Sequence, residues 1–96
     1  AIVQPSLIQI NNKSFLLITD KTSFNNIQQK IKVNAVIISG NPKLYLNNLV
    51  KYIDCKIIVA DATNPLWKIG KWKKDAEQLH LQLHSVPDEG AFEMNL

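Results

Sequence analysis

The sequence predicts an α/β fold in which strands and helices alternate around one layered sheet. Two observations carry this prediction. Short runs rich in β-branched residues, such as residues 33–39 and 56–60, recur along the chain, and each is followed by residues that favour the start of a helix. Strands that alternate with helices are typical of βαβ units, whose middle strands are parallel. The expected order of elements is β-β-α-β-α-β-α-β-β, with antiparallel hairpins at both ends.

A β-hairpin and a short helix are expected in the first third of the chain. Residues 7–10 and 14–18 are apolar runs that flank a polar turn at residues 11–13, where asparagine tolerates a positive φ. Ser23 is a candidate N-cap, and apolar residues then recur at spacings of three and four. This periodicity predicts an amphipathic helix that ends near Lys32.

Two strand–helix pairs follow. Residues 33–39 form the next expected strand, and Pro42 suits the first turn of a helix whose apolar positions extend to Ile53. Residues 56–60 form another strand, after which Asn64-Pro65 places an N-cap and a first helical residue in sequence.

The C-terminal part is expected to hold one long helix and a closing hairpin. The helix runs to about His80, and a strand follows at residues 81–86. A turn at residues 87–90 and a last strand at residues 91–94 complete the chain.

Length and composition indicate one globular domain, residues 1–96, or the C-terminal half of a larger one. The 96 residues are 46% hydrophobic and 20% charged, which is ordinary globular composition. The longest apolar runs are far below the roughly 18 residues of a membrane span, so we expect this segment itself to be soluble. All eleven cations are lysines. Proteins that recognise base sequence commonly use the bidentate hydrogen bonds of arginine, so sequence-specific nucleic-acid recognition is disfavoured. Non-specific electrostatic attraction to nucleic acid remains possible.

Four stretches resemble, in order and spacing, the C-terminal half of the metallo-β-lactamase-like domain of ComEC-type DNA-uptake proteins. These are residues 6–20, 34–42, 61–67 and 88–92, which are similar to that family's "SLVL…LLTGD", "DVLKVSHHGS", "GHPH" and "DGAI" elements. Parts of the second to fourth stretches resemble the variant C-terminal regions of Bacteroidetes-like members. The resemblance implies a domain of an inner-membrane competence protein, on the extracytoplasmic (periplasmic) side, that helps to take up transforming single-stranded DNA.

The family's metal ligands are lost at the matching positions. Only Asp20 matches a ligand, the bridging aspartate, whereas Ser39-Gly40-Asn41 and Thr63-Asn64 replace the histidines. A two-metal hydrolase needs several histidine and carboxylate ligands. We therefore expect no metal site, no cofactor and no catalytic residues, with Asp20 as a vestige.

Two alternatives remain open. The chain could belong to a metal-dependent nuclease whose ligands, including an HxHxDH motif, lie upstream of it. It could also be a structural or protein-interaction module that makes no contact with DNA. The resemblance further implies the membrane-embedded channel portion of the same protein as a partner.

Residues 67–74 contain two tryptophans and four lysines and are the best candidate for contact with a partner. On a helical wheel one side, expected in the core, holds Leu66, Ile69, Trp72, Ala76 and Leu79. The other side holds Trp67, Lys71, Lys74 and Gln78. Trp67 could stack on a base while Lys71 and Lys74 meet phosphates, which predicts weak binding of single-stranded DNA without sequence preference. The alternative is that Trp67 covers the sheet edge and the lysines are only solvated.

Three other polar or reactive features are expected to carry no chemistry. His80 and His84 are four residues apart, but they straddle the end of a helix and a strand, so they do not share a helix face and are expected to be ordinary surface residues. Asp61 follows a strand, where sites often lie in α/β folds, yet an Asx-type turn is the favoured role. The single Cys55 is expected to be a small apolar filler.

Overall fold

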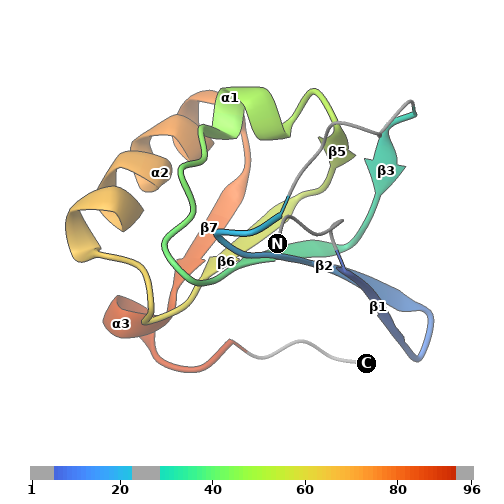
Figure 1. Cartoon of the computed structure of the whole chain (residues 1–96), viewed down its shortest axis with the longest axis horizontal. Coiled ribbons are helices and arrows are strands. Elements are labelled where there is room, and N and C mark those ends of the chain that lie inside the picture. Colours follow the sequence, from blue (N-terminus) through green and yellow to red (C-terminus); the bar gives the residue numbers. More distant parts are fainter. Residues whose placement is uncertain (1–5, 23–28, 93–96) are drawn as a thin grey trace.

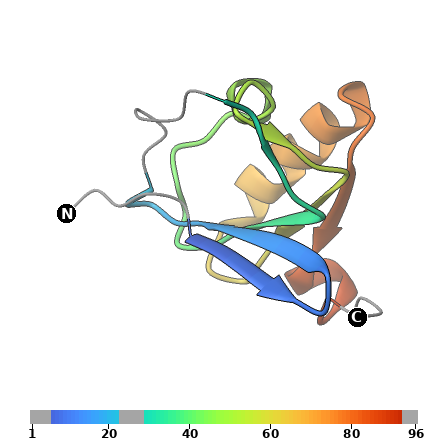
Figure 2. The same ribbon diagram turned by 90° about the vertical axis from the view of Figure 1, so that its right-hand side faces the viewer.

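The computed structural model describes residues 6–22 and 29–92, which form a five-stranded sheet with two helices on one face (Figure 1, Figure 2). The sheet has the order β1-β2-β4-β6-β7, and its strands are β1 (Ser6–Ile10), β2 (Lys13–Ile18), β4 (Ala35–Ile38), β6 (Ile57–Ala60) and β7 (Gln82–Ser85). A two-stranded sheet pairs β3 (Ile31–Lys32) with β5 (Ile53–Asp54). The helices are α1 (Leu46–Leu49), α2 (Leu66–Gln78) and α3 (Val86–Glu89). The α/β class is confirmed.

The hairpin at the start is confirmed. Strand β1 pairs antiparallel with β2, with Ile8 opposite Phe15. Asn11 and Asn12 form the turn with φ of 47° and 68°. Asparagine accepts this left-handed conformation more readily than most residues, so the two asparagines allow the tight reversal.

The parallel part of the sheet follows the chain in order. Strands β2, β4, β6 and β7 each pair in parallel with the next one, so every connection must return to the opposite end of the sheet. Helices α1 and α2 lie within these connections, and both pack on the same face (Figure 1, Figure 2). All carboxyl ends of these strands therefore meet at one edge of the sheet.

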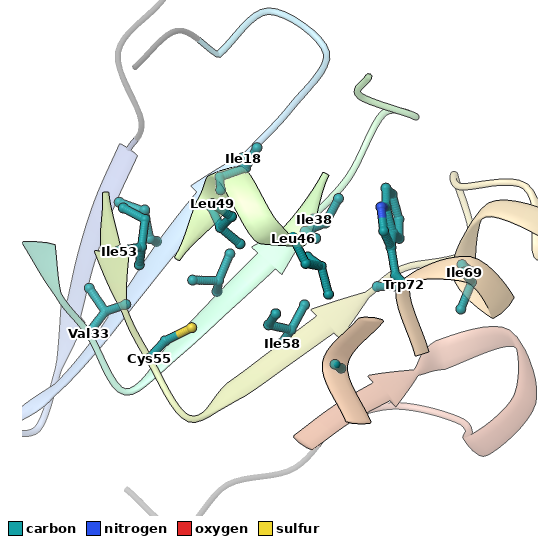
Figure 3. Close-up of a cluster of buried hydrophobic side chains, with 14 residues drawn as sticks. Ile18, Val33, Ile38, Leu46, Leu49, Ile53, Cys55, Ile58, Ile69 and Trp72 are labelled. Atoms are coloured by element: carbon teal, nitrogen blue, oxygen red, sulfur yellow. The ribbon is translucent and has the colours of Figure 1, made fainter. Parts of the chain in front are cut away.

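The core lies between this sheet face and the two helices (Figure 3). Leu46, Leu49 and Trp72 reach from the helices to Ile38 and Ile58 on the sheet, and all five side chains are at most 1% exposed. The indole Nε1–H of Trp72 donates a hydrogen bond of 2.9 Å to the carbonyl oxygen of Leu44. The prediction that Trp72 is a core residue is therefore confirmed.

The prediction of a helix that extends to about Lys32 is wrong for the last residues of that helix. Residues Ile31 and Lys32 form β3, where the backbone N–H groups of Ile31 and Val33 donate to the carbonyl oxygens of Tyr52 and Asp54 at 2.8 and 2.9 Å. Pairing with a distant segment thus overrides the local helical periodicity. The start of this expected helix, residues 23–28, lies outside the described residues.

Other boundaries also differ from the expected order. The second helix is the single turn α1, and Ile53 lies in β5. The turn at residues 87–90 lies largely within the single-turn helix α3, and residues 91 and 92 belong to no strand. The last two residues of that expected strand, 93–94, lie outside the described residues.

The long helix is shorter than expected by a residue or two at each end. Pro65 is the N-cap rather than the first helical residue, and α2 ends at Gln78. His80 has a φ of 59°, and this left-handed residue turns the chain from α2 towards β7. Across the described ranges, no helix has both the length and the apolar character needed to cross a bilayer.

Candidate functional site

Helix α2 separates a buried side from an exposed side that carries the candidate contact residues. Ile69, Trp72 and Ala76 are 1% exposed and face the core. Trp67 is 71% exposed, and Lys71, Lys74 and Gln78 are exposed too. This division was predicted from the sequence, except that Leu66 is 62% exposed. Leu66 is the first residue of α2, three residues before the first buried position of the helix, Ile69.

Two lysines of α2 lie against aromatic rings. The Nζ atom of Lys68 is 5.6 Å from the ring centroid of Trp67, and that of Lys71 is 4.7 Å from the ring centroid of Tyr45. Both distances are within the range of cation–π attraction. Tyr45 is the N-cap of α1 and is 57% exposed. Sequence analysis missed it, because its place beside α2 follows from the packing of the two helices and not from any local motif.

We call the surface formed by Tyr45, Trp67, Lys68, Lys71 and Lys74 the aromatic–lysine face. One of its lysines, Lys68, is held in place by hydrogen bonds. The ammonium of Lys68 donates to Oδ1 of Asn41 at 2.6 Å and to the carbonyl oxygen of Pro42 at 3.1 Å, so the loop after β4 holds it in place. An exposed aromatic ring beside ammonium groups can stack on a flat ring and attract an anion at the same time.

The residues that the sequence resemblance aligns with metal ligands lie close together at the carboxyl edge of the sheet. A Cβ added to Gly40 would lie 3.3 Å from Oδ1 of Asp20, so the ends of β2 and β4 approach closely. The N–H of Gly40 donates to Oγ1 of Thr63 at 2.7 Å, and Oγ of Ser39 lies 3.3 Å from the same Thr63 oxygen. The ends of β4 and β6 are therefore linked by hydroxyl groups.

Asn64 ties the loops after β4 and β6 together. Its Nδ2 donates to the carbonyl oxygens of Ile38 and Asp61 at 2.9 and 3.1 Å, and its Oδ1 accepts from the N–H of Asn41 at 3.1 Å. The side chain is 4% exposed and makes no capping hydrogen bond to α2, so its expected role as an N-cap is wrong. This buried amide stabilises the carboxyl edge, because its hydrogen bonds join the loop after β4 to the loop after β6.

Asp61 forms the expected turn. Its Oδ1 accepts from the backbone N–H of Thr63 at 3.0 Å and also from the Thr63 hydroxyl, which is the Asx-type pattern predicted from the sequence. Burial works to raise the pKa of Asp61. Hydrogen bonds from Thr63 and Ser39 outweigh that effect and hold the pKa below its usual value.

The two histidines lie in different environments. His80 is exposed in the turn after α2, whereas His84 lies in β7 with its Nε2 2.7 Å from the carbonyl oxygen of Gly90. The ring of His84 also meets Phe92 edge-on at 5.4 Å. The prediction that their spacing does not mark one helix face is confirmed. Within residues 6–22 and 29–92, no three His, Cys, Asp or Glu side chains form a group that could hold a metal ion.

Cys55 is the apolar filler that the sequence predicted. It is 8% exposed and belongs to the hydrophobic core (Figure 3). Burial, together with the charge of Asp54, raises the pKa of its thiol to about 11. The thiol therefore stays protonated near neutral pH and is a poor nucleophile.

The comparisons with known proteins place the chain in a family. The sequence model of the ComEC C-terminal domain matches residues 3–96. Neither the curated proteins nor the solved structures contain a match to the chain. Because the match spans nearly the whole sequence, the chain belongs to the ComEC C-terminal domain family.

Proposed function

We propose that this domain is a non-catalytic part of a ComEC-like competence protein and takes part in the uptake of transforming DNA. It does so by weak contact with single-stranded DNA at the aromatic–lysine face. The observation that carries the proposal is the 71% exposure of Trp67 among lysines on one side of α2.

The chemistry of this face suits a single strand better than a duplex. Unpaired bases offer flat rings, and stacking on an aromatic side chain contributes about 1–3 kcal/mol per base. Tyr45 supplies a second exposed ring beside Lys71. The ammonium groups act as point charges on the phosphates and do not read base edges, so binding is indifferent to sequence and weakens as salt rises.

A non-catalytic role agrees with the side chains at the carboxyl edge. Ser39, Thr63 and Asn64 offer hydroxyl and amide groups, which are poor ligands for zinc, and they bond to one another's loops. Asp20 beside Gly40 is the one carboxylate that matches the family's ligand pattern. In this proposal the edge is a structural crosslink.

Membership of the ComEC C-terminal domain family supports the proposed setting. We expect the domain to work on the extracytoplasmic side of the inner membrane, docked on the membrane-embedded channel portion of the same protein. In that setting weak binding is useful, because a strand in transit must leave each contact as readily as it enters.

Fluorescence anisotropy with a labelled single-stranded oligonucleotide at low salt tests the proposal. Trp67→Ala should weaken binding by roughly 5- to 150-fold, which corresponds to about 1–3 kcal/mol of lost stacking. Lys71→Ala should lower the slope of log Kd against log salt by about 0.7, the value for one phosphate contact on a single strand. Lys21→Ala is the matched control, because Lys21 is an exposed lysine beyond the end of β2.

Two outcomes would count against DNA contact at this face. If the chain binds no oligonucleotide at low salt, the domain is better explained as a structural or protein-interaction module that makes no contact with DNA. If Lys21→Ala changes binding as much as Lys71→Ala, the attraction belongs to net charge and not to the aromatic–lysine face.

A further inference from the structure

A hollow of about 420 Å³ lies at the amino end of the sheet, away from the carboxyl edge described above. It lies at the junction between two parallel strand pairs, β3–β5 and β4–β6, which come one after the other along the same two chain segments. Strand β3 leads into β4 and β5 leads into β6, and two residues in each chain segment, 33–34 and 55–56, separate the β3–β5 pair from the β4–β6 pair. Figure 1 shows β3 and β5 beyond the starts of β4 and β6.

The bond from the N–H of Val33 to the carbonyl oxygen of Asp54 closes the β3–β5 pair, and the next backbone hydrogen bonds at this break run outwards to the neighbouring strands. The N–H of Asn34 donates to the carbonyl oxygen of Ser14 in β2 at 2.9 Å, and the carbonyl oxygen of Lys56 accepts from the N–H of Gln82 in β7 at 3.0 Å. The side chain of Asn34 strengthens the first link by accepting from the N–H of Ser14 at 2.7 Å. Each side of the break is therefore tied to its own outer neighbour, and the hollow lies between them.

Three lysines from separate segments line the hollow. Lys13 begins β2, Lys32 ends β3 and Lys56 precedes β6, and among the described residues that line the hollow Asp54 is the only one with a carboxylate. Three ammonium groups and one carboxylate leave an excess of two positive charges. Within the described part of the chain, no salt bridge neutralises any of the three lysines. Val33 and Cys55 complete the wall, and the Cys55 thiol adds no negative charge because its pKa is raised to about 11.

We propose that this hollow binds a dianionic phosphate group through Lys13, Lys32 and Lys56. Like charges gathered at one place repel one another, and a bound anion removes that repulsion. A phosphate monoester carries about −1.5 to −2 charges near pH 7, which matches the excess at the hollow. Lysine is a common binder of phosphate as a point charge, and about 420 Å³ lies within the range of small-ligand sites.

This site does not depend on the proposed contact with DNA at the aromatic–lysine face. Helix α2 begins beyond the carboxyl end of β6, whereas the hollow lies at the amino ends of β4 and β6. Lys13 lies on the same face of β2 as Phe15 and Leu17, whereas Leu16 and Ile18 on the other face belong to the core under the helices, so Lys13 lies on the sheet face opposite to the helices. Variants at the two places therefore report on different surfaces.

Calorimetric titration of the 96-residue chain with sodium phosphate, with sodium chloride added to hold the ionic strength constant, tests this inference. Phosphate should bind saturably, and Lys32→Gln and Lys56→Gln should each weaken it at least tenfold, as expected for a lost charge-assisted contact. Both lysines are exposed, so these changes should leave the fold intact. The matched control is Lys73→Gln, an exposed lysine of α2 that does not line the hollow.

A second titration separates the two sources of such a group. A short oligonucleotide with a 5′-phosphate is compared with the same oligonucleotide ending in a 5′-hydroxyl. Saturable binding of phosphate alone points to a free ion, and preference for the 5′-phosphate points to a nucleic-acid end; either result, if lost in Lys32→Gln, supports the site. If neither probe saturates, or if Lys73→Gln weakens binding as much as Lys32→Gln, the inference is wrong.

Discussion

Replacing Trp72 by alanine is the sharpest test of how α2 is seated on the sheet. The side chain is 1% exposed, and a buried tryptophan removes roughly 150–250 Å² from water, which at about 25 cal/mol per Å² corresponds to about 4–6 kcal/mol. Structure remaining in the unfolded chain lowers this figure. Trp72→Ala should therefore lower the free energy of unfolding by about 3–5 kcal/mol, the usual range for such truncations.

Part of this loss belongs to one hydrogen bond. The Nε1–H of Trp72 donates to the carbonyl oxygen of Leu44, and this bond holds the segment before α1 against α2. Trp72→Phe keeps an aromatic ring in the core but removes the donor. It should lower the free energy of unfolding by less than the alanine variant, with about 1 kcal/mol of the loss due to the bond.

Urea unfolding followed by far-ultraviolet circular dichroism measures both variants, and Trp67→Ala is the matched control from the same helix. Because Trp67 is 71% exposed, its removal should change the free energy of unfolding by less than about 1 kcal/mol. Equal losses for Trp67→Ala and Trp72→Ala would refute the assignment of buried and exposed sides. Should Trp72→Ala fail to fold, the comparison of Trp72→Phe with Trp67→Ala still decides the matter.

Three further predictions concern the polar edge and the core. Asn64→Ala should cost about 2–4 kcal/mol, because it removes three hydrogen bonds that the buried amide makes to the loops after β4 and β6, whereas the exposed Asn47→Ala should stay within about 0.5 kcal/mol in the same urea assay. The pKa of Asp61 is lower in the fold than in the unfolded chain, so its stabilising effect is present above the unfolded pKa and is lost as the pH falls through the folded one. Asp61→Asn should therefore flatten the dependence of stability on pH below about pH 4, and an unchanged profile would contradict this. Cys55, with a thiol pKa of about 11, should react with a disulfide reagent about 100-fold more slowly in the fold than in denaturant, and equal rates would show that it is accessible and ionised.

Much of the fold could be predicted from local patterns. The hairpin followed from two apolar runs around an asparagine turn, and strands β4 and β6 followed from their β-branched runs. The two sides of α2 followed from helical periodicity, since a helix packed on a sheet must bury one stripe. These features depend on near neighbours in the sequence, which is why the sequence alone was sufficient.

Pairings between distant segments could not be predicted in this way. Ile31 fits a helical repeat as well as a strand, and only the approach of residues 52–54 decides that it lies in β3. Asn64 has the sequence context of a helix cap, yet its amide turns to the carbonyl of Ile38 across the sheet edge. Local propensity differs by fractions of a kcal/mol, so a hydrogen bond to a distant partner is enough to reverse it.

The sequence by itself determined the α/β class and the family, because these depend on which residues are present and in what order. Only the tertiary structure decided which side chains are neighbours. It placed Tyr45 beside Lys71 and gathered Lys13, Lys32 and Lys56 around one hollow. Parallel strands bring residues that are some twenty positions apart to the same end of a sheet, and no short-range pattern records that proximity.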